Sequence, residues 1–73
     1  MVEISIYSEF ITLGQFLKLS NEINNGGEAK FYLQNKVVLV NNELENRRGR
    51  KLRVGDIVKI DTRVYAIVRK DEN

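Results

Sequence analysis

The sequence predicts an α+β fold in which two short helices pack on a small, mostly antiparallel sheet. Residues 2–7 and most of residues 38–68 show the short apolar patterns of strands, whereas residues 12–35 space their apolar side chains as helices do. The chain has 73 residues, the size of one domain, and a domain this small buries only about 60% of its unfolded surface. We therefore expect a single domain over residues 1–73, with modest stability.

The N-terminal part is expected to form a strand and then a helix. Apolar and polar residues alternate over residues 2–7, which predicts a half-buried strand. The side chains expected to face the core are Val2, Ile4 and Ile6. Thr12 offers a side-chain oxygen that caps a helix over residues 12–20, and Gln15 stands at the spacing of a capping box.

A second helix is expected over residues 27–35, after the turn-forming residues 21–27. Its inner stripe would consist of Ala29, Tyr32 and Leu33. We expect the two helices to share one face of the sheet. Aromatic side chains at these spacings are more often core than base-stacking groups. Those assigned to the core are Phe10, Phe16, Phe31, Tyr32 and Tyr65, and Tyr7 is left open.

The C-terminal half is expected to consist of short strands. Their predicted ranges are residues 38–40, 43–45, 56–60 and 64–68. Asn41 and Asn42 tolerate the left-handed backbone of a tight turn, and residues 61–63 would close a hairpin. Leu52 is expected to be a buried anchor. Residues 70–73 resemble a polar tail.

A cationic segment lies between two of these strands. Residues 46–53 hold five of the twelve basic residues of the chain, and no acid interrupts them. The five are Arg47, Arg48, Arg50, Lys51 and Arg53. A cationic loop between two strands favours a polyanionic partner, most often nucleic acid. The alternative is a solvated loop that only keeps the chain soluble.

The charge of the whole chain is polarised along the sequence. Residues 1–28 carry one base and four acids, a net charge of −3, whereas residues 29–73 carry eleven bases and six acids, a net charge of +5. One end is therefore expected to repel phosphate and the other to attract it, which would orient a bound nucleic acid.

Composition argues against several classes of function. The chain has no cysteine and no histidine, which removes disulfides, thiolate metal sites and the commonest general base. No nucleophile motif and no phosphate-cradling loop before a helix occurs in it. No apolar stretch approaches the roughly 20 residues that span a bilayer, and the N-terminus lacks the features of a signal peptide. We expect a cytoplasmic protein with no enzymatic activity, metal, cofactor or membrane partner.

Several short motifs, in order, resemble the S-four RNA-binding domain, a family named after ribosomal small-subunit protein four and also called the alpha-L motif. They are Glu28-Ala29, Leu33, Val38-Leu-Val-Asn-Asn42 and Val54-Gly-Asp-Ile57. The chain is most similar to the short stand-alone bacterial members, over about residues 12–60. It departs from the family pattern in residues 12–17, where the usual R-L-D start is absent, at Gly26-Gly27, and at Asn42, where glycine is typical.

The resemblance implies a basic, L-shaped surface that faces structured RNA and is formed by the second helix and the following hairpin. The residues it assigns to that surface are Lys30, Gln34, Lys36, Asn41, Asn42, Arg47, Arg48, Arg50 and Lys51. Arg53 is a further candidate, with pairing to Asp56 as the alternative. Arginine suits this role because its planar fork holds a phosphate through two hydrogen bonds and stacks on unpaired bases. Asn41 is expected to be a turn-former whose side chain bonds its own backbone.

Among the neighbours of the basic residues, Gly49, Glu43 and Glu45 have alternative interpretations. Gly49 either lets the backbone approach a phosphate or only makes a turn. Glu43 and Glu45 are interpreted as charge balance or as residues that orient the arginines. Gly55 is expected to make a tight turn that enters a strand.

Three hypotheses for function follow. The first is a non-catalytic module that binds structured RNA, ribosomal or transfer RNA. The second is an adaptor that docks its basic loop on an acidic protein surface, on a ribosome or in another complex, including one that handles DNA. The third is a sulfur carrier, which needs a C-terminal Gly-Gly, whereas this chain ends Arg69-Lys-Asp-Glu-Asn73. The sequence does not fix the oligomeric state.

Overall fold

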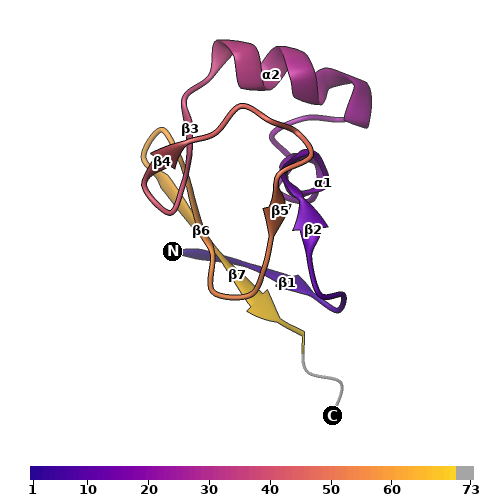
Figure 1. Cartoon of the computed structure of the whole chain (residues 1–73), viewed down its shortest axis with the longest axis vertical. Helices are drawn as coiled ribbons and strands as arrows, with labels where there is room; N and C mark the ends of the chain where they lie inside the picture. The colour runs from indigo at the N-terminus through magenta and orange to yellow at the C-terminus, as the bar shows by residue number, and fades with distance from the viewer. Residues whose placement is uncertain (71–73) are drawn as a thin grey trace.

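In the computed structural model, which describes residues 1–70, two α-helices and seven short strands form a small α+β structure (Figure 1). In chain order the elements are β1 (Val2–Ile6), β2 (Ile11–Thr12), α1 (Leu13–Leu19), a 3-10 turn η1 (Gly26–Glu28), α2 (Ala29–Asn35), β3 (Val38–Val40), β4 (Glu43–Leu44), β5 (Lys51–Leu52), β6 (Ile57–Ile60) and β7 (Arg63–Arg69). The predicted fold class is confirmed. Of the polar tail expected at residues 70–73, all but Lys70 lies outside the described residues.

The main sheet has the strand order β1-β7-β6-β3-β4, in which β1 runs parallel to β7 and the other neighbours are antiparallel. The predicted hairpin is confirmed, with a tighter turn than expected, because Ile60 pairs with Arg63 across two residues. Asp61 takes the left-handed backbone there, with φ 56°. A second, two-stranded sheet of β2 and β5 was not predicted from the sequence.

The start of α1 is fixed by the predicted capping box. The Thr12 hydroxyl accepts a hydrogen bond from the Gln15 amide at 3.2 Å, and the Gln15 side chain accepts one from the Thr12 amide at 2.8 Å. These bonds satisfy two backbone donors that a helix start leaves open. At the start of η1, which leads into α2, the Asn25 side chain accepts from the Gly27 amide at 3.0 Å.

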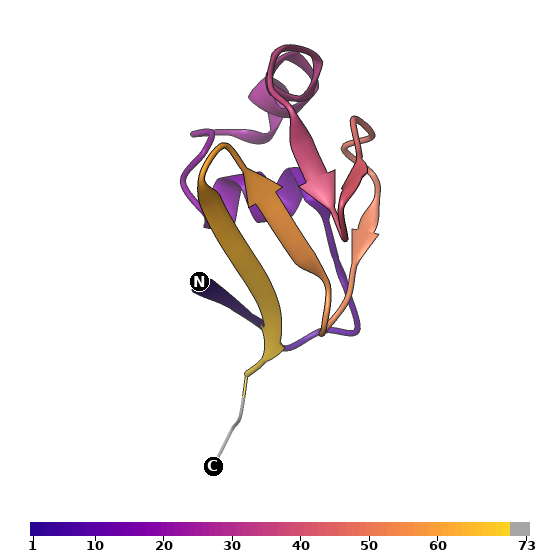
Figure 2. The ribbon, with the colours of Figure 1, turned by 90° about the vertical axis from the view of Figure 1, so that its left-hand side faces the viewer.

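The core lies between the main sheet and the helices. Figure 2 shows β7, β6 and β3 side by side with α1 behind them and α2 at one end of the molecule. Fully enclosed side chains come from both layers, and the largest is Phe16 of α1. Its ring meets the ring of Tyr65 of β7 edge to face, with 5.1 Å between the centroids.

Three side chains that the sequence assigned to the core lie elsewhere. Val2 is 51% exposed, because β1 is the edge strand of the sheet. Phe31 is 71% exposed, because it lies two positions, or about 200° around the helix, from the buried Ala29. Phe10 is only partly buried. Of the remaining residues assigned to the core, Ile6, Phe16 and Tyr65 are buried as expected.

None of the helices within residues 1–70 has both the length and the apolar character needed to cross a bilayer.

Candidate nucleic-acid interface

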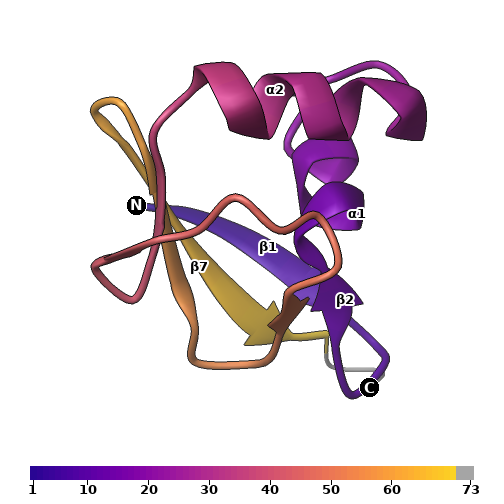
Figure 3. The same ribbon diagram turned by 45° about the horizontal axis from the view of Figure 1, so that its top comes forward.

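Residues 46–53, here called the basic loop, are fixed to the start of α1. The amides of Leu13 and Gly14, in the first turn of the helix, donate to the carbonyls of Arg50 and Arg48 at 2.8 and 2.9 Å. Leu52 is fully buried beneath the end of the loop, as predicted. Figure 3 shows the segment crossing from β4 to the start of α1 and then entering β5. The backbone of the loop is therefore held at both ends by ordered structure.

One buried carboxylate organises the arginines of the loop. Glu45 is only 6% exposed and accepts four hydrogen bonds of 3.0 Å. Three come from the amide and guanidinium of Arg47, and the fourth comes from the guanidinium of Arg50. The interpretation that Glu45 orients the arginines is confirmed, whereas Glu43 is exposed.

The same contacts perturb the ionisation of this group. The hydrogen bonds from the Arg47 side chain lower the pKa of Glu45 to about 2, against the opposing effect of burial. The carboxylate in turn raises the pKa of Arg47. Glu45 therefore stays ionised across the neutral range and keeps both guanidiniums in place.

An aromatic ring organises the other end of the loop. The Lys51 ammonium lies 4.9 Å from the centre of the Phe10 ring, and the Arg53 guanidinium carbon lies 5.7 Å from it. Both distances are in the range of cation–π contacts. Arg53 also meets Asp56, but through its backbone amide, which donates to the carboxylate at 2.8 Å. The expected pairing of Arg53 with Asp56 therefore occurs through the backbone of Arg53, and its guanidinium lies against Phe10.

Two shallow clefts meet at the tip of the loop. The first has a volume of about 510 Å³ and is lined by Arg47, Gly49, Arg50, Lys51 and Arg53. The second, of about 370 Å³, lies against the start of α1, and Lys18, Arg48 and Gly49 contribute to its walls. Gly49 borders both, and within residues 1–70 a Cβ placed on it would meet no atom within 4 Å. A ligand backbone can thus approach this tip closely.

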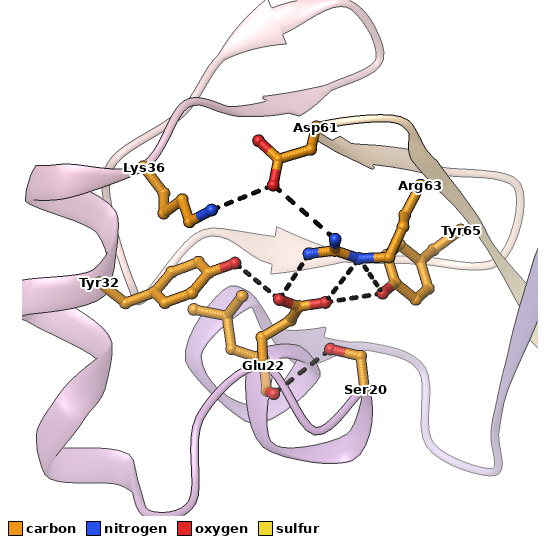
Figure 4. Close-up of polar contacts among 8 residues, drawn as sticks. Ser20, Glu22, Tyr32, Lys36, Asp61, Arg63 and Tyr65 are labelled. Carbon is orange, nitrogen blue, oxygen red and sulfur yellow. Dashed lines mark hydrogen bonds and ion pairs between the residues drawn. The ribbon is translucent and has the colours of Figure 1, made fainter.

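The predicted residues on α2 divide into two groups. Lys30 and Gln34 are exposed on the helix. Lys36, at its C-terminal end, forms an ion pair with Asp61 at 3.0 Å. Figure 4 shows that Lys36 borders a polar network centred on Glu22, to which Asp61 links it.

Glu22 ties the segment between the helices to α2 and β7. Its carboxylate accepts from the hydroxyls of Tyr32 and Tyr65, both at 2.8 Å, and from the guanidinium of Arg63 at 2.7 and 3.0 Å. Burial opposes ionisation of Glu22, but these hydrogen bonds outweigh it and lower its pKa. Burial and the hydrogen bond to Glu22 raise the pKa of Tyr32. The network fixes the position of α2, from which Lys30 and Gln34 project.

Asn41 and Asn42 form the turn between β3 and β4 with left-handed backbone, at φ 51° and 70°, as predicted. The Asn41 side chain bonds Asp56 and the Ile57 amide, at 3.0 and 2.9 Å, rather than its own backbone. The prediction that Asn41 forms a turn is confirmed, but the prediction that its side chain bonds its own backbone is wrong, because the side chain instead joins the turn to the start of β6. The Asn42 side-chain oxygen accepts from the Lys59 ammonium at 3.1 Å.

Comparison with known proteins identifies the family. The model of the S4 domain family matches residues 4–68. The chain belongs to the S4 domain family. A curated relative, the probable ribosome maturation protein RlbA of Bacillus subtilis (strain 168), is 62% identical over 58 residues, which cover 80% of this chain and 82% of the relative.

The S4 resemblance found in the sequence is thus confirmed, but three features of the interface were not predicted. Phe10 was assigned to the core, and Lys18 was not singled out. Lys18 lies three residues after Gln15, on the same face of α1, but only the docked loop brings it beside Arg48. The sequence also did not predict that Glu45 is buried or that it accepts four hydrogen bonds. Within residues 1–70 no group of three acidic, cysteine or histidine side chains is placed to hold a metal ion.

Proposed function

We propose that this S4 domain is a non-catalytic module that binds structured RNA through the basic loop and α2. The observation that carries the proposal is the cleft lined by Arg47, Arg50, Lys51 and Arg53, in which the two arginines nearest Glu45 are oriented before any ligand arrives. Oriented arginine forks suit phosphate oxygens, and groups already fixed lose little freedom on binding.

The residues have different parts in the proposed complex. Arg47 and Arg50 hold phosphates in the first cleft, and Arg48 holds one at the second. Gly49 lets the RNA backbone approach the tip. The remaining members of the surface are Lys51, Arg53, Lys30 and Gln34. Lys36, Asn41 and Asn42 have weaker parts, because Asp61, Ile57 and Lys59 already engage their side chains.

The relative's name gives the first RNA to test. A protein 62% identical to this chain is named a probable ribosome maturation protein. We therefore propose ribosomal RNA, rather than transfer RNA, as the ligand to test first, and the ribosome as the particle on which it is bound. A role of this kind places the protein in the cytoplasm.

The test is a fluorescence-anisotropy titration with a labelled ribosomal RNA hairpin and the corresponding DNA duplex at several salt concentrations. If four or five phosphates are neutralised, log affinity should fall against log salt with a slope of about −3 to −4. Arg48→Ala/Lys51→Ala should flatten that slope by about 1 to 2. These two residues are chosen because neither is bonded to Glu45, so the loop keeps its anchor.

The matched control is Lys70→Glu, which lowers the net charge by the same amount at the residue that follows β7. It should leave the slope within about 0.5 of the wild-type value, since the change lies outside the proposed site. If the two variants changed the salt slope equally, the loop would contribute only its positive charge and would not be a specific binding site. Absence of binding to RNA and DNA at low salt, with the protein folded, would overturn the proposal and leave the adaptor hypothesis in its place.

A further inference from the structure

The small sheet of β2 and β5 presents one face to the core and the other to solvent. Ile11 pairs with Leu52, and both side chains are buried. Because side chains alternate along a strand, the neighbours on either side point the other way. Thr12 pairs with Lys51 on that outer face. One step further in the same register, Phe10 stands opposite Arg53.

The backbone that carries Phe10 is held in place. The Arg69 guanidinium donates to the carbonyls of Tyr7 and Ser8 at 2.7 and 2.8 Å, which ties the segment before β2 to the end of β7. The Ser8 hydroxyl donates to the Phe10 carbonyl at 2.7 Å. The ring is thus a fixed, partly exposed aromatic surface with two cations against it.

Phe10 lies beside the first cleft, because Lys51 and Arg53, which contact its ring, also line that cleft. An aromatic ring next to phosphate-binding cations is the arrangement with which proteins hold single-stranded nucleotides, the ring stacking on a base and the cations following the backbone. Phe31 is more exposed, but Lys36, the one cation of residues 1–70 that lines its groove, is paired with Asp61. Glu28 lines the same groove, so no set of free cations from that part of the chain lies beside this ring.

We propose that Phe10 is a stacking platform for one unpaired base of the bound RNA, with the adjoining phosphates in the first cleft. The inference rests on the proposed RNA-binding function and specifies the ligand. The preferred RNA is a helix flanked by at least one unpaired nucleotide, not an uninterrupted duplex. With Phe10 included, the proposed interface extends beyond the basic loop and α2 to the segment before β2.

The experiment compares an RNA hairpin with the same hairpin carrying a short single-stranded extension at either end. For the wild type, the extension at one end should strengthen binding by about tenfold, the order expected for one base stacked on an aromatic side chain. Phe10→Leu should lose most of this gain, measured against the affinity of the same variant for the bare hairpin. Phe10→Tyr, which keeps a ring, and Phe31→Leu, which removes the exposed phenylalanine of α2, should both retain the gain.

A second readout uses the wild-type protein alone, so its result does not depend on whether a variant folds. The base analogue 2-aminopurine, placed in the extension, should lose fluorescence when it stacks on the ring. Unchanged fluorescence in the saturated complex would overturn the proposal, as would an extension gain that survives in Phe10→Leu. Hairpin binding with no gain from either extension would overturn the stacking proposal and leave the RNA-binding function standing. No hairpin binding at all would overturn the function itself.

Discussion

Replacing Glu45 with glutamine tests whether the buried carboxylate holds the basic loop together. The change keeps the size of the side chain and removes its charge. In the wild type, both carboxylate oxygens accept hydrogen bonds from Arg47 or Arg50. A glutamine has one acceptor oxygen, and its amide group would face donors. The variant should therefore lose bonds in a place where Glu45 is only 6% exposed.

The size of the effect follows from the pKa. Lowering the pKa of Glu45 from its ordinary 4.5 to about 2 corresponds to about 3 kcal/mol of stability, at about 1.4 kcal/mol for each pKa unit. The side chain of Arg47 is 73% exposed, so solvent screening reduces the contribution of that pair. We expect Glu45→Gln to lower the free energy of unfolding by about 1–2 kcal/mol at pH 7.

The effect should depend on pH with a definite sign. A carboxylate whose pKa is lower in the folded state stabilises the fold at pH values above its unfolded pKa. The stabilisation by Glu45 is therefore complete above pH 4.5 and is lost as the pH falls towards 2. The gap between wild type and Glu45→Gln should be full at pH 7 and should shrink between pH 4.5 and pH 3. Glu22, whose pKa is also lowered, is present in both proteins and does not change the gap.

The assay is urea unfolding followed by circular dichroism at pH 7, 5, 4 and 3. Glu43→Gln is the control, because this exposed neighbour on β4 should change the free energy of unfolding by less than about 0.5 kcal/mol. A gap that is the same at every pH would refute the assignment of the effect to the charge of Glu45. A gap no larger than that of Glu43→Gln at pH 7 would refute the anchoring role altogether.

Two further changes test other parts of the fold. Gly55→Ala should lower the free energy of unfolding by about 1–3 kcal/mol, because Gly55 has φ 100° and a side chain is strained there. Gly49 lies in open space and has no such φ, so Gly49→Ala should lower the free energy of unfolding by less than about 0.5 kcal/mol. Equal losses for the two variants in urea unfolding would contradict the explanation from backbone strain. Glu22→Gln should cost about 1–2 kcal/mol at pH 7, because a partly buried acceptor of hydrogen bonds from Arg63 and Tyr65 is weakened. Since the pKa of Glu22 is lowered, this cost should fall in acid, and a cost that rises as the pH falls would contradict it.

Local signals in the sequence were enough to predict the features whose contacts join residues a few positions apart. Thr12 and Gln15 stand three residues apart, and their capping box needs nothing from the rest of the chain. Asn41 and Asn42 mark their turn because few other residues adopt the left-handed backbone. The buried face of α2 follows from its helical spacing, and the same spacing places Phe31 outside.

Contacts between distant segments were not predictable in this way. The sheet of β2 and β5 has two residues in each strand, too few for an alternating pattern to be recognised. The seat of the basic loop depends on the Leu13 amide meeting the Arg50 carbonyl, a contact that no local pattern encodes. Phe10 was misassigned for the same reason, since its solvent-facing position follows only from the pairing of β2 with β5.

Glu45 is a buried acid next to the basic loop, and two opposing free-energy terms decide whether it weakens or strengthens the proposed binding of RNA. The charge of Glu45 repels a phosphate roughly 8 Å away by only about 0.5 kcal/mol in a watery surface environment. Ordering two arginine side chains on binding would cost about 1–3 kcal/mol, and Glu45 shifts that cost to folding. Glu45→Gln should therefore weaken RNA binding by about 2- to 70-fold, the difference between the two terms, although it makes the loop more positive. Anisotropy titration of the folded variant at moderate salt measures this, and tighter binding would show that charge outweighs orientation in this loop.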